Sequence, residues 1–221
     1  MIVLAAVHDQ LGDALAQIAA ALQIPVLLAA LGVLVLCALE LGRYASEQWQ
    51  RRVRARDVPL RELAHAVAQE PGLADAHAGD APTAFAAQAL HQIAAGLTAR
   101  RPLAIEHALA DYELAAQRRL DRTRMLVRAG PAIGLMGTLI PLAPGLAALG
   151  RGDVASLAGD LRTAFAATVV GLLVGTIAFA LTLSRTRMYS EDLTALERAT
   201  ETLAPTVADA VAPAVVGEGA A

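Results

Sequence analysis

The fold is decided by the sequence AGPAIGLMGTLIPLAPGLAAL, residues 129–149, together with TAFAATVVGLLVGTIAFALTLS, residues 163–184. Neither stretch contains a charged side chain. A helix rises about 1.5 Å per residue, so each stretch is long enough to cross a hydrocarbon core of about 30 Å. The chain is therefore predicted to be an all-α integral membrane protein, with these stretches as its second and third spans.

The first span is predicted at residues 24–42. The run from Ile24 to Leu39 is apolar throughout and ends at Glu40, so it reaches membrane length with the residues that flank it. Residues 1–23 are predicted to form an amphipathic helix on the outer side that leads into this span. They differ from an export signal, because they lack Lys and Arg and contain acidic residues.

Arginine placement predicts the orientation, because basic residues that flank a span stay on the cytoplasmic side. Residues 43–128 are therefore predicted to be cytoplasmic, residues 150–162 to be a short outer loop, and the C-terminus to lie inside. The arginines that follow the first span or precede the second are Arg43, Arg51, Arg52, Arg54, Arg56, Arg118, Arg119, Arg122, Arg124 and Arg128.

The segments outside the spans also have a helical pattern. Breaks are expected at Pro71-Gly72 and at Pro102. The predicted segments are helices at 58–70 and 83–101, a small-residue linker at 74–82, a helix from Leu103 into the second span, a helix at 185–203 and a disordered tail at 204–221.

Each of the two central spans gathers small residues on one face when it is drawn as a wheel of about 100° per residue. A face of this kind lets another helix backbone approach closely, and pairs of the form GxxxG are typical of it. The predicted helix-packing residues are Gly130, Gly134 and Gly137 in the second span and Gly171 and Gly175 in the third.

Polar groups lie on or beside these small faces. Pro141 and Pro144 each leave a backbone carbonyl without its helical donor, and Thr138, Thr163 and Thr168 add hydroxyls. The functional interpretation is that Pro141 and the three threonines border a polar path. The structural alternative is that each hydroxyl bonds a carbonyl one turn back and that the small faces only pack.

Missing chemistry limits the function. Neither central span contains Asp, Glu or His, the residues that a proton relay within a bilayer normally uses. Glu40 lies at the end of the first span near Arg43, where a carboxylate can stay at the water boundary at little cost. A proton path through these helices would therefore need a titrating group from another subunit.

Signatures of enzymes and cofactors are weak. Glu62 and His65 have the i, i+3 spacing of half a di-iron site. Such a site needs a second copy of this spacing and further glutamates on facing helices, and Glu106-His107 does not supply that spacing. The single Cys37 excludes an intramolecular disulfide and a cysteine-based zinc site. No enzyme, cofactor or metal is predicted, and the basic clusters fit anionic lipid head groups better than nucleic acid.

The run GPAIGLMGTL, residues 130–139, followed by AFAATVVGL, residues 164–172, resembles the MotA/TolQ/ExbB proton-channel family. The resemblance covers about residues 103–190. Three spans, an outer N-terminus and one large cytoplasmic segment resemble the ExbB/TolQ branch. In that family the large subunit forms a ring, a pentamer in this branch, around the membrane helices of a small single-span ExbD/TolR-like subunit.

The resemblance implies a subunit of a stator in the cytoplasmic membrane of a bacterium or archaeon, driven by the proton-motive force. The partner's helix would carry the titrating aspartate, and Thr138 and Thr168 match the family's lumen-facing threonines. Two departures mark a divergent member. Thr163 replaces a glutamate that is usual near the start of the last span, and Pro141 and Pro144 are additional. The rival hypothesis is a non-conducting membrane scaffold that uses the same faces for assembly.

Overall fold

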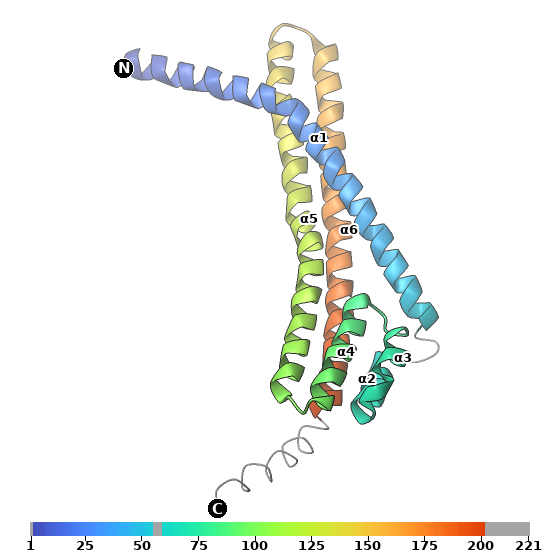
Figure 1. Cartoon of the computed structure of the whole chain (residues 1–221). Coiled ribbons are helices and arrows are strands. Elements are labelled where there is room, and N and C mark those ends of the chain that lie inside the picture. The colour runs from blue at the N-terminus through green and yellow to red at the C-terminus, as the bar shows by residue number, and fades with distance from the viewer. Residues whose placement is uncertain (1, 55–58, 202–221) are drawn as a thin grey trace, which may run out of the picture. The chain divides into compact units, whose positions relative to one another are not determined.

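The computed structural model describes residues 2–54 and 59–201, and the regular elements of these residues are all helical (Figure 1). Three of the helices are long, and four shorter elements lie between the first and second of them in the sequence. The elements are α1 (Ile2–Arg54), α2 (Leu60–Gln69), the 3-10 helix η1 (Pro71–Leu73), α3 (Ala74–Ala78), α4 (Ala84–Thr98), α5 (Pro102–Gly150) and α6 (Val154–Glu201).

The three long helices α1, α5 and α6 are each long and apolar enough to cross a membrane. The prediction of an all-α protein with three spans is therefore confirmed. Outside these helices, the described part of the chain contains no further candidate span.

The described chain divides into two compact units, to which α1, α5 and α6 all contribute. The span unit consists of the residues up to 42 and of residues 122–182. The extension unit consists of residues 43–121 and 183–201.

In the span unit, α5 and α6 lie side by side and α1 packs against both. A cluster of buried side chains joins the three helices through Val33 and Cys37 of α1, Leu126 of α5 and Val174 of α6. Figure 1 shows that the axis of α1 changes direction in the first half of the helix. Pro25 is the proline inside α1, and a proline both removes a helical hydrogen bond and crowds the preceding turn.

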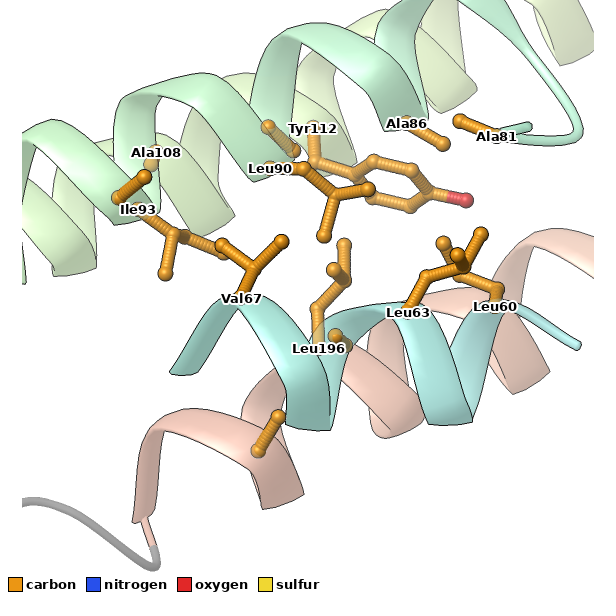
Figure 2. Packing of buried hydrophobic residues seen from close by; sticks show 14 of the residues in the cluster. Leu60, Leu63, Val67, Ala81, Ala86, Leu90, Ile93, Ala108, Tyr112 and Leu196 are labelled. Carbon is orange, nitrogen blue, oxygen red and sulfur yellow. The ribbon is translucent and has the colours of Figure 1, made fainter. Parts of the chain in front are cut away.

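The extension unit has its own apolar core, formed by α2, α4, α5 and α6 (Figure 2). Leu63, Leu90 and Leu196 in this core have no exposed surface. Phe85 of α4 packs its ring 5.0 Å from that of Tyr112, an edge-to-face type of distance that adds to the burial of both rings. The extension unit therefore has a hydrophobic core of its own.

The connection between α5 and α6 is shorter than the outer loop predicted at 150–162. Only residues 151–153 are non-helical, and α6 begins at Val154. Asp153 starts the helix, because its carboxylate accepts hydrogen bonds from the backbone N–H of Ser156 at 3.1 Å and from its hydroxyl at 2.6 Å. The balanced charges of this segment misled the prediction, since they belong to the first turns of a helix.

Other differences concern short segments. Part of the predicted linker at 74–82 forms α3. Of the helix predicted at 185–203, residues 185–201 are the end of the continuous α6, and residues 202–203 lie outside the described part of the chain. Residues 1–23 likewise continue into the first span as one helix from Ile2. The tail predicted at 204–221 lies outside the described residues.

Candidate functional site

Small residues form the contact between α5 and α6. A β-carbon placed on Gly171 would lie 2.5 Å from the carbonyl oxygen of Gly130 and 2.7 Å from the α-carbon of Gly134. Non-bonded carbon atoms favour a separation of about 3.5–4.0 Å, so these positions accept only glycine without movement of a backbone. The GxxxG stretches of the two spans therefore meet each other within one chain.

The same contact continues along both helices. A β-carbon on Gly137 would lie 2.6 Å from that of Ala167, and one on Gly175 would lie 2.8 Å from the Cγ of Pro131. Pro131 has no N–H, so the carbonyl of Val127 lacks its helical donor. A β-carbon on Gly175 would lie 3.5 Å from this carbonyl oxygen. All the predicted helix-packing glycines thus lie at the α5–α6 contact.

Helix α1 covers one side of this pair. The thiol of Cys37 donates a weak hydrogen bond to the carbonyl of Val174, with 3.9 Å between sulfur and oxygen. Nearer the other end, a β-carbon on Gly137 would lie 4.0 Å from Val26. The buried residues of α1 recur every three or four positions, as expected for one packed helix face: Val26, Ala30, Val33, Cys37 and Glu40.

Glu40 lies on this buried stripe. Its exposed fraction is 6%, whereas Arg43 is exposed. The side chain is packed because Glu40 follows Cys37 by three positions on the same helix face. Its place at the water boundary near Arg43 stays a prediction.

The predicted hydroxyls donate to backbone carbonyls. Thr138 donates to the carbonyl of Leu135 at 2.7 Å, and Thr163 bonds a carbonyl of its own helix at 3.2 Å. Thr168 differs, because it reaches across to the carbonyl of Gly134 on α5 at 3.4 Å. Each hydroxyl therefore donates its hydrogen bond to a carbonyl, while its oxygen can still accept a hydrogen bond from another group.

Thr138 and Thr168 lie on the side of the pair that faces away from α1. On α5, Gly137 lies near Val26 of α1, and Thr138 is turned about 100° from Gly137 around the helix. On α6, Val170 packs in the cluster with α1, and Thr168 is turned about 160° from Val170. Both threonines are half-buried at the edge of the α5–α6 contact, and Thr163 is exposed. The structure thus brings two of the three predicted hydroxyls to one side.

Pro141 is fully buried. Its predicted place beside a polar path stays a prediction. Pro144, placed on the same small face, is exposed, because it lies toward the edge of that face. Helix α5 continues through both prolines and through Pro131 without a break.

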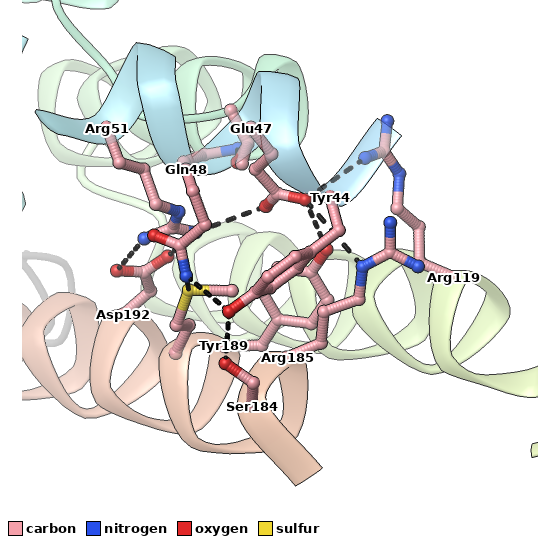
Figure 3. Close-up of polar contacts among 12 residues, drawn as sticks. Tyr44, Glu47, Gln48, Arg51, Arg119, Ser184, Arg185, Tyr189 and Asp192 are labelled. Atoms are coloured by element: carbon pink, nitrogen blue, oxygen red, sulfur yellow. Dashed lines mark hydrogen bonds and ion pairs between the residues drawn. The ribbon is translucent and has the colours of Figure 1, made fainter. Parts of the chain in front are cut away.

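A buried polar cluster in the extension unit was not predicted (Figure 3). Arg51 of α1 donates two hydrogen bonds to Asp192 of α6, at 3.2 and 2.7 Å. Tyr112 of α5 donates to the same carboxylate at 3.2 Å. A two-pronged bond between guanidinium and carboxylate fixes direction as well as distance, so this group sets the register of three helices that are distant in sequence.

Glu47 is the second centre of the cluster. It is 6% exposed, and its carboxylate accepts a hydrogen bond from the hydroxyl of Tyr189 at 3.2 Å. Arg51, Arg119 and Arg185 lie 3.5, 3.7 and 3.9 Å away as ion pairs. A buried carboxylate is tolerated only where charges and donors compensate it, and here residues from α1, α5 and α6 supply them together.

Neutral side chains extend the cluster along α1 and α6. The hydroxyls of Tyr44 and Ser184 lie 2.5 Å apart. Gln48 donates to Tyr44 at 2.8 Å and to the sulfur of Met188 at 3.1 Å. These contacts satisfy polar atoms that the packing of α1 against α6 removes from water.

The cluster keeps its tyrosines neutral and its arginine charged. Burial, with the negative charge of Glu47, raises the pKa of Tyr189 from 10.0 to about 12. Burial and the charge of Asp192 raise the pKa of Tyr112 far above its usual range. Burial by itself lowers the pKa of Arg51, but the hydrogen bond and charge of Asp192 outweigh it, so the pKa of Arg51 is raised.

One signal in the sequence could have revealed this cluster. The buried stripe of α1 continues beyond the first span at the same spacing of three or four residues, through Tyr44, Glu47 and Arg51. A stripe that changes from apolar to charged without changing its period predicts a packed polar face. The sequence analysis used the arginines only for orientation.

The two candidate metal ligands lie on α2 without a third candidate ligand beside them in the described part of the chain. Glu62 is exposed on α2 and His65 is half-buried. In the described part of the chain, no group of three or more His, Cys, Asp or Glu residues is placed to hold a metal ion. A di-iron site needs further carboxylates on facing helices, so this arrangement gives Glu62 and His65 no such site.

Three long apolar helices, with a glycine contact between two of them, are the features of a multi-pass membrane protein. The chain matches the MotA/TolQ/ExbB proton channel family over residues 79–198, more than half of its length. It belongs to this family. Neither the curated proteins nor the solved structures include a match to the chain.

The matched region extends beyond the resemblance seen in the sequence, which covered about residues 103–190. It includes α4, all of α5 and most of α6. Proteins of this family are membrane proton channels and not enzymes. The matched region thus includes part of the extension unit as well as the second and third spans.

Proposed function

We propose that this chain is the channel-forming subunit of a stator-type complex that converts the proton-motive force into mechanical work. In this proposal, several copies of the chain, a pentamer by resemblance, form a ring in the cytoplasmic membrane. Their α5 and α6 spans surround the membrane helix of an ExbD/TolR-like subunit that carries a titrating aspartate. The N-terminus lies outside and the extension unit lies in the cytoplasm.

The observation that carries the proposal is the pair of hydroxyls Thr138 and Thr168 on the side of α5 and α6 that α1 leaves open. A protonated carboxyl group has one O–H to donate, and each of these hydroxyl oxygens can accept it. The two threonines therefore suit the neutral, proton-carrying state of a partner's aspartate. Thr163 lies about 140° from Thr168 around α6, so it does not belong to this surface.

The energies are compatible with transport. A hydrogen bond between membrane helices contributes about 0.6 kcal/mol on average and at most about 1.7 kcal/mol. A membrane potential of about 100 mV supplies about 2.3 kcal/mol for each charge that crosses. The hydroxyls thus orient and stabilise the protonated acid without holding it against the driving force.

The scaffold alternative also has an observation in its favour. The small faces of α5 and α6 are occupied by each other within one chain, and the hydroxyls of Thr138, Thr163 and Thr168 all bond backbone carbonyls. A purely structural role would use no more than these contacts. The two functions differ in whether the open side with Thr138 and Thr168 must be polar.

Proton flux distinguishes them. The tagged chain is purified from its native membrane with the single-span subunit that accompanies it, and both are reconstituted in vesicles that contain a pH-sensitive dye. Thr168→Val should lower the flux about threefold to fifteenfold, the factor that corresponds to one membrane hydrogen bond. Thr176→Val is the matched control, because Thr176 is exposed on the same helix and bonds its own backbone at 2.9 Å.

The channel proposal requires the Thr168 and Thr138 variants to assemble normally and to conduct less than the Thr176 variant. Equal flux in all of them would show that the assigned hydroxyls have no part in conduction. If wild-type vesicles conduct no protons while the complex assembles, the scaffold function is the correct one.

A further inference from the structure

Asp160 lies on the face of α6 that packs against α5. The segment that contains it was expected to be a loop, but α6 is helical from Val154 onward. Asp160 precedes Ala164 by four positions and Ala167 by seven, and both alanines are buried at the α5–α6 contact. Helix periodicity therefore puts the carboxylate on the same stripe, about three turns before Gly171.

Gly145 of α5 lies beside this carboxylate. A β-carbon on Gly145 would lie 3.4 Å from the Oδ2 of Asp160 and 3.2 Å from the side chain of Leu157. Gly145 belongs to the uncharged stretch 129–149, four residues before its end, and four residues of helix correspond to about 6 Å. Asp160 thus lies at the depth of the last turn of the second span.

The carboxylate is half-buried and uncompensated. Among residues 2–54 and 59–201, no hydrogen bond or ion pair joins it to another residue. The nearest charges in sequence are Arg151 and Asp153 in the turn and the exposed Arg162 on α6. The facing stretch of α5 is uncharged, and α1 has no Asp, Glu, His or Arg from residue 17 to 39.

Helix capping does not explain the residue. Asp153 already caps α6 through Ser156, and the field of a helix terminus falls off within the first turn. Asp160 is the seventh residue of α6. An ionisable group in a membrane-spanning helix pair is costly and, as a rule, functional, so an uncapped, unpaired carboxylate here indicates a role outside folding.

We propose that Asp160 is a proton-binding residue at the outer end of the α5–α6 contact. This inference rests on the proposed channel function and supplies the titratable group that both central spans lack. The carboxylate takes a proton from hydronium in the outer water and becomes the neutral acid. It then releases the same proton to the carboxylate of the partner helix and returns to its charged form.

The negative charge and the proton-binding capacity act together at this position. A carboxylate at the outer end of a low-dielectric helix pair raises the local concentration of cations, which speeds entry by about tenfold or more. Because the glycine contact between α5 and α6 is tightly packed, the proton passes from Asp160 to the partner helix and not between the two spans.

Asp160→Asn tests the proposal in the vesicle flux assay, with the partner subunit present. The flux should fall about tenfold, and Asp160→Glu should keep most of it because the carboxylate remains. Asp153→Asn is the matched control. It removes an exposed carboxylate from the same end of α6, and asparagine caps a helix about as well as aspartate.

Chemical rescue on the assembled complex separates conduction from folding. Asp160→Cys is placed in a Cys37→Ala background, since Cys37 is the only native cysteine. Alkylation with iodoacetate restores a carboxylate at residue 160, and alkylation with iodoacetamide adds a neutral group of the same shape. Only iodoacetate should restore proton flux.

The outcomes are distinguishable from a failure of the channel function itself. If wild-type vesicles conduct and Asp160→Asn conducts as well as Asp153→Asn, the role of Asp160 is wrong while the channel stands. Equal rescue by both reagents would also overturn it, because the carboxylate would then be unnecessary. If wild-type vesicles conduct nothing, both proposals fall together.

Discussion

Replacing Gly171 by alanine tests the contact on which the arrangement of the spans depends. The new methyl group would lie 2.5 Å from the carbonyl oxygen of Gly130 and 2.7 Å from the α-carbon of Gly134. These are backbone atoms, which cannot turn aside as the end of a side chain can. Restoring a normal contact of about 3.5 Å requires α5 and α6 to separate by about 1 Å.

The expected cost follows from three contributions. Inserting a methyl group into a packed interior costs about 1–3 kcal/mol. The separation also breaks the bond from Thr168 to the carbonyl of Gly134, at about 0.6 kcal/mol. The gain in helix propensity from glycine to alanine, about 1 kcal/mol, is common to the control Gly159→Ala, whose β-carbon meets no atom within 4 Å.

We therefore expect Gly171→Ala to be about 2–4 kcal/mol less stable than Gly159→Ala. Cys37 provides the assay, because this cysteine is 2% exposed in the cluster that joins α1 to the pair. A thiol reagent reaches it only when the helices open, so its labelling rate in detergent reports the opening equilibrium. The rate should rise about 30- to 700-fold. Equal rates in the two variants would refute the close contact between α5 and α6.

Two further predictions concern the buried polar cluster. Asp192→Asn removes the two-pronged partner of Arg51 and should cost about 3–5 kcal/mol in the free energy of unfolding, as expected for a broken buried ion pair; chemical unfolding in detergent checks this against the exposed control Glu191→Gln, and similar stability of both variants would contradict it. The raised pKa of Tyr189, from 10.0 to about 12, means that the folded chain holds this proton after the unfolded chain has lost it. Stability from this group is therefore complete below pH 10 and is lost as the pH rises toward 12. Tyrosinate absorbance during alkaline unfolding follows this loss, and Tyr189→Phe should remove this part of it; an unchanged alkaline profile would count against the burial of the hydroxyl beside Glu47.

Much of the span architecture follows from local sequence. Uncharged stretches of about twenty residues have few alternatives to a membrane helix, because every backbone polar group must be satisfied within it. The stripes of glycine and alanine could also be read from periodicity. The wheel thus indicated which faces of α5 and α6 accept a close neighbour, and Gly130, Gly134 and Gly171 lie on those faces at the contact.

Other features could not be read from the same pattern. A small face does not say which helix covers it, and the structure shows that α5 and α6 cover each other. Pro141, which the sequence analysis placed beside a polar path, is fully buried in the single chain. The start of α6 was missed because the charges of residues 151–162 resemble those of a loop, whereas the cap at Asp153 is a local signal of only one residue.

The sequence by itself determined the class of protein, three apolar helices of membrane length with two small faces, because hydrophobicity and period are properties of a single helix. Only the tertiary structure decided what those faces meet, that Glu47 and Asp192 lie in one buried polar cluster, and that Asp160 lies against Gly145. Such contacts join residues far apart in the chain, and their energies depend on burial and on partners from other helices. A local pattern of residues specifies neither the burial of a side chain nor its partners on other helices.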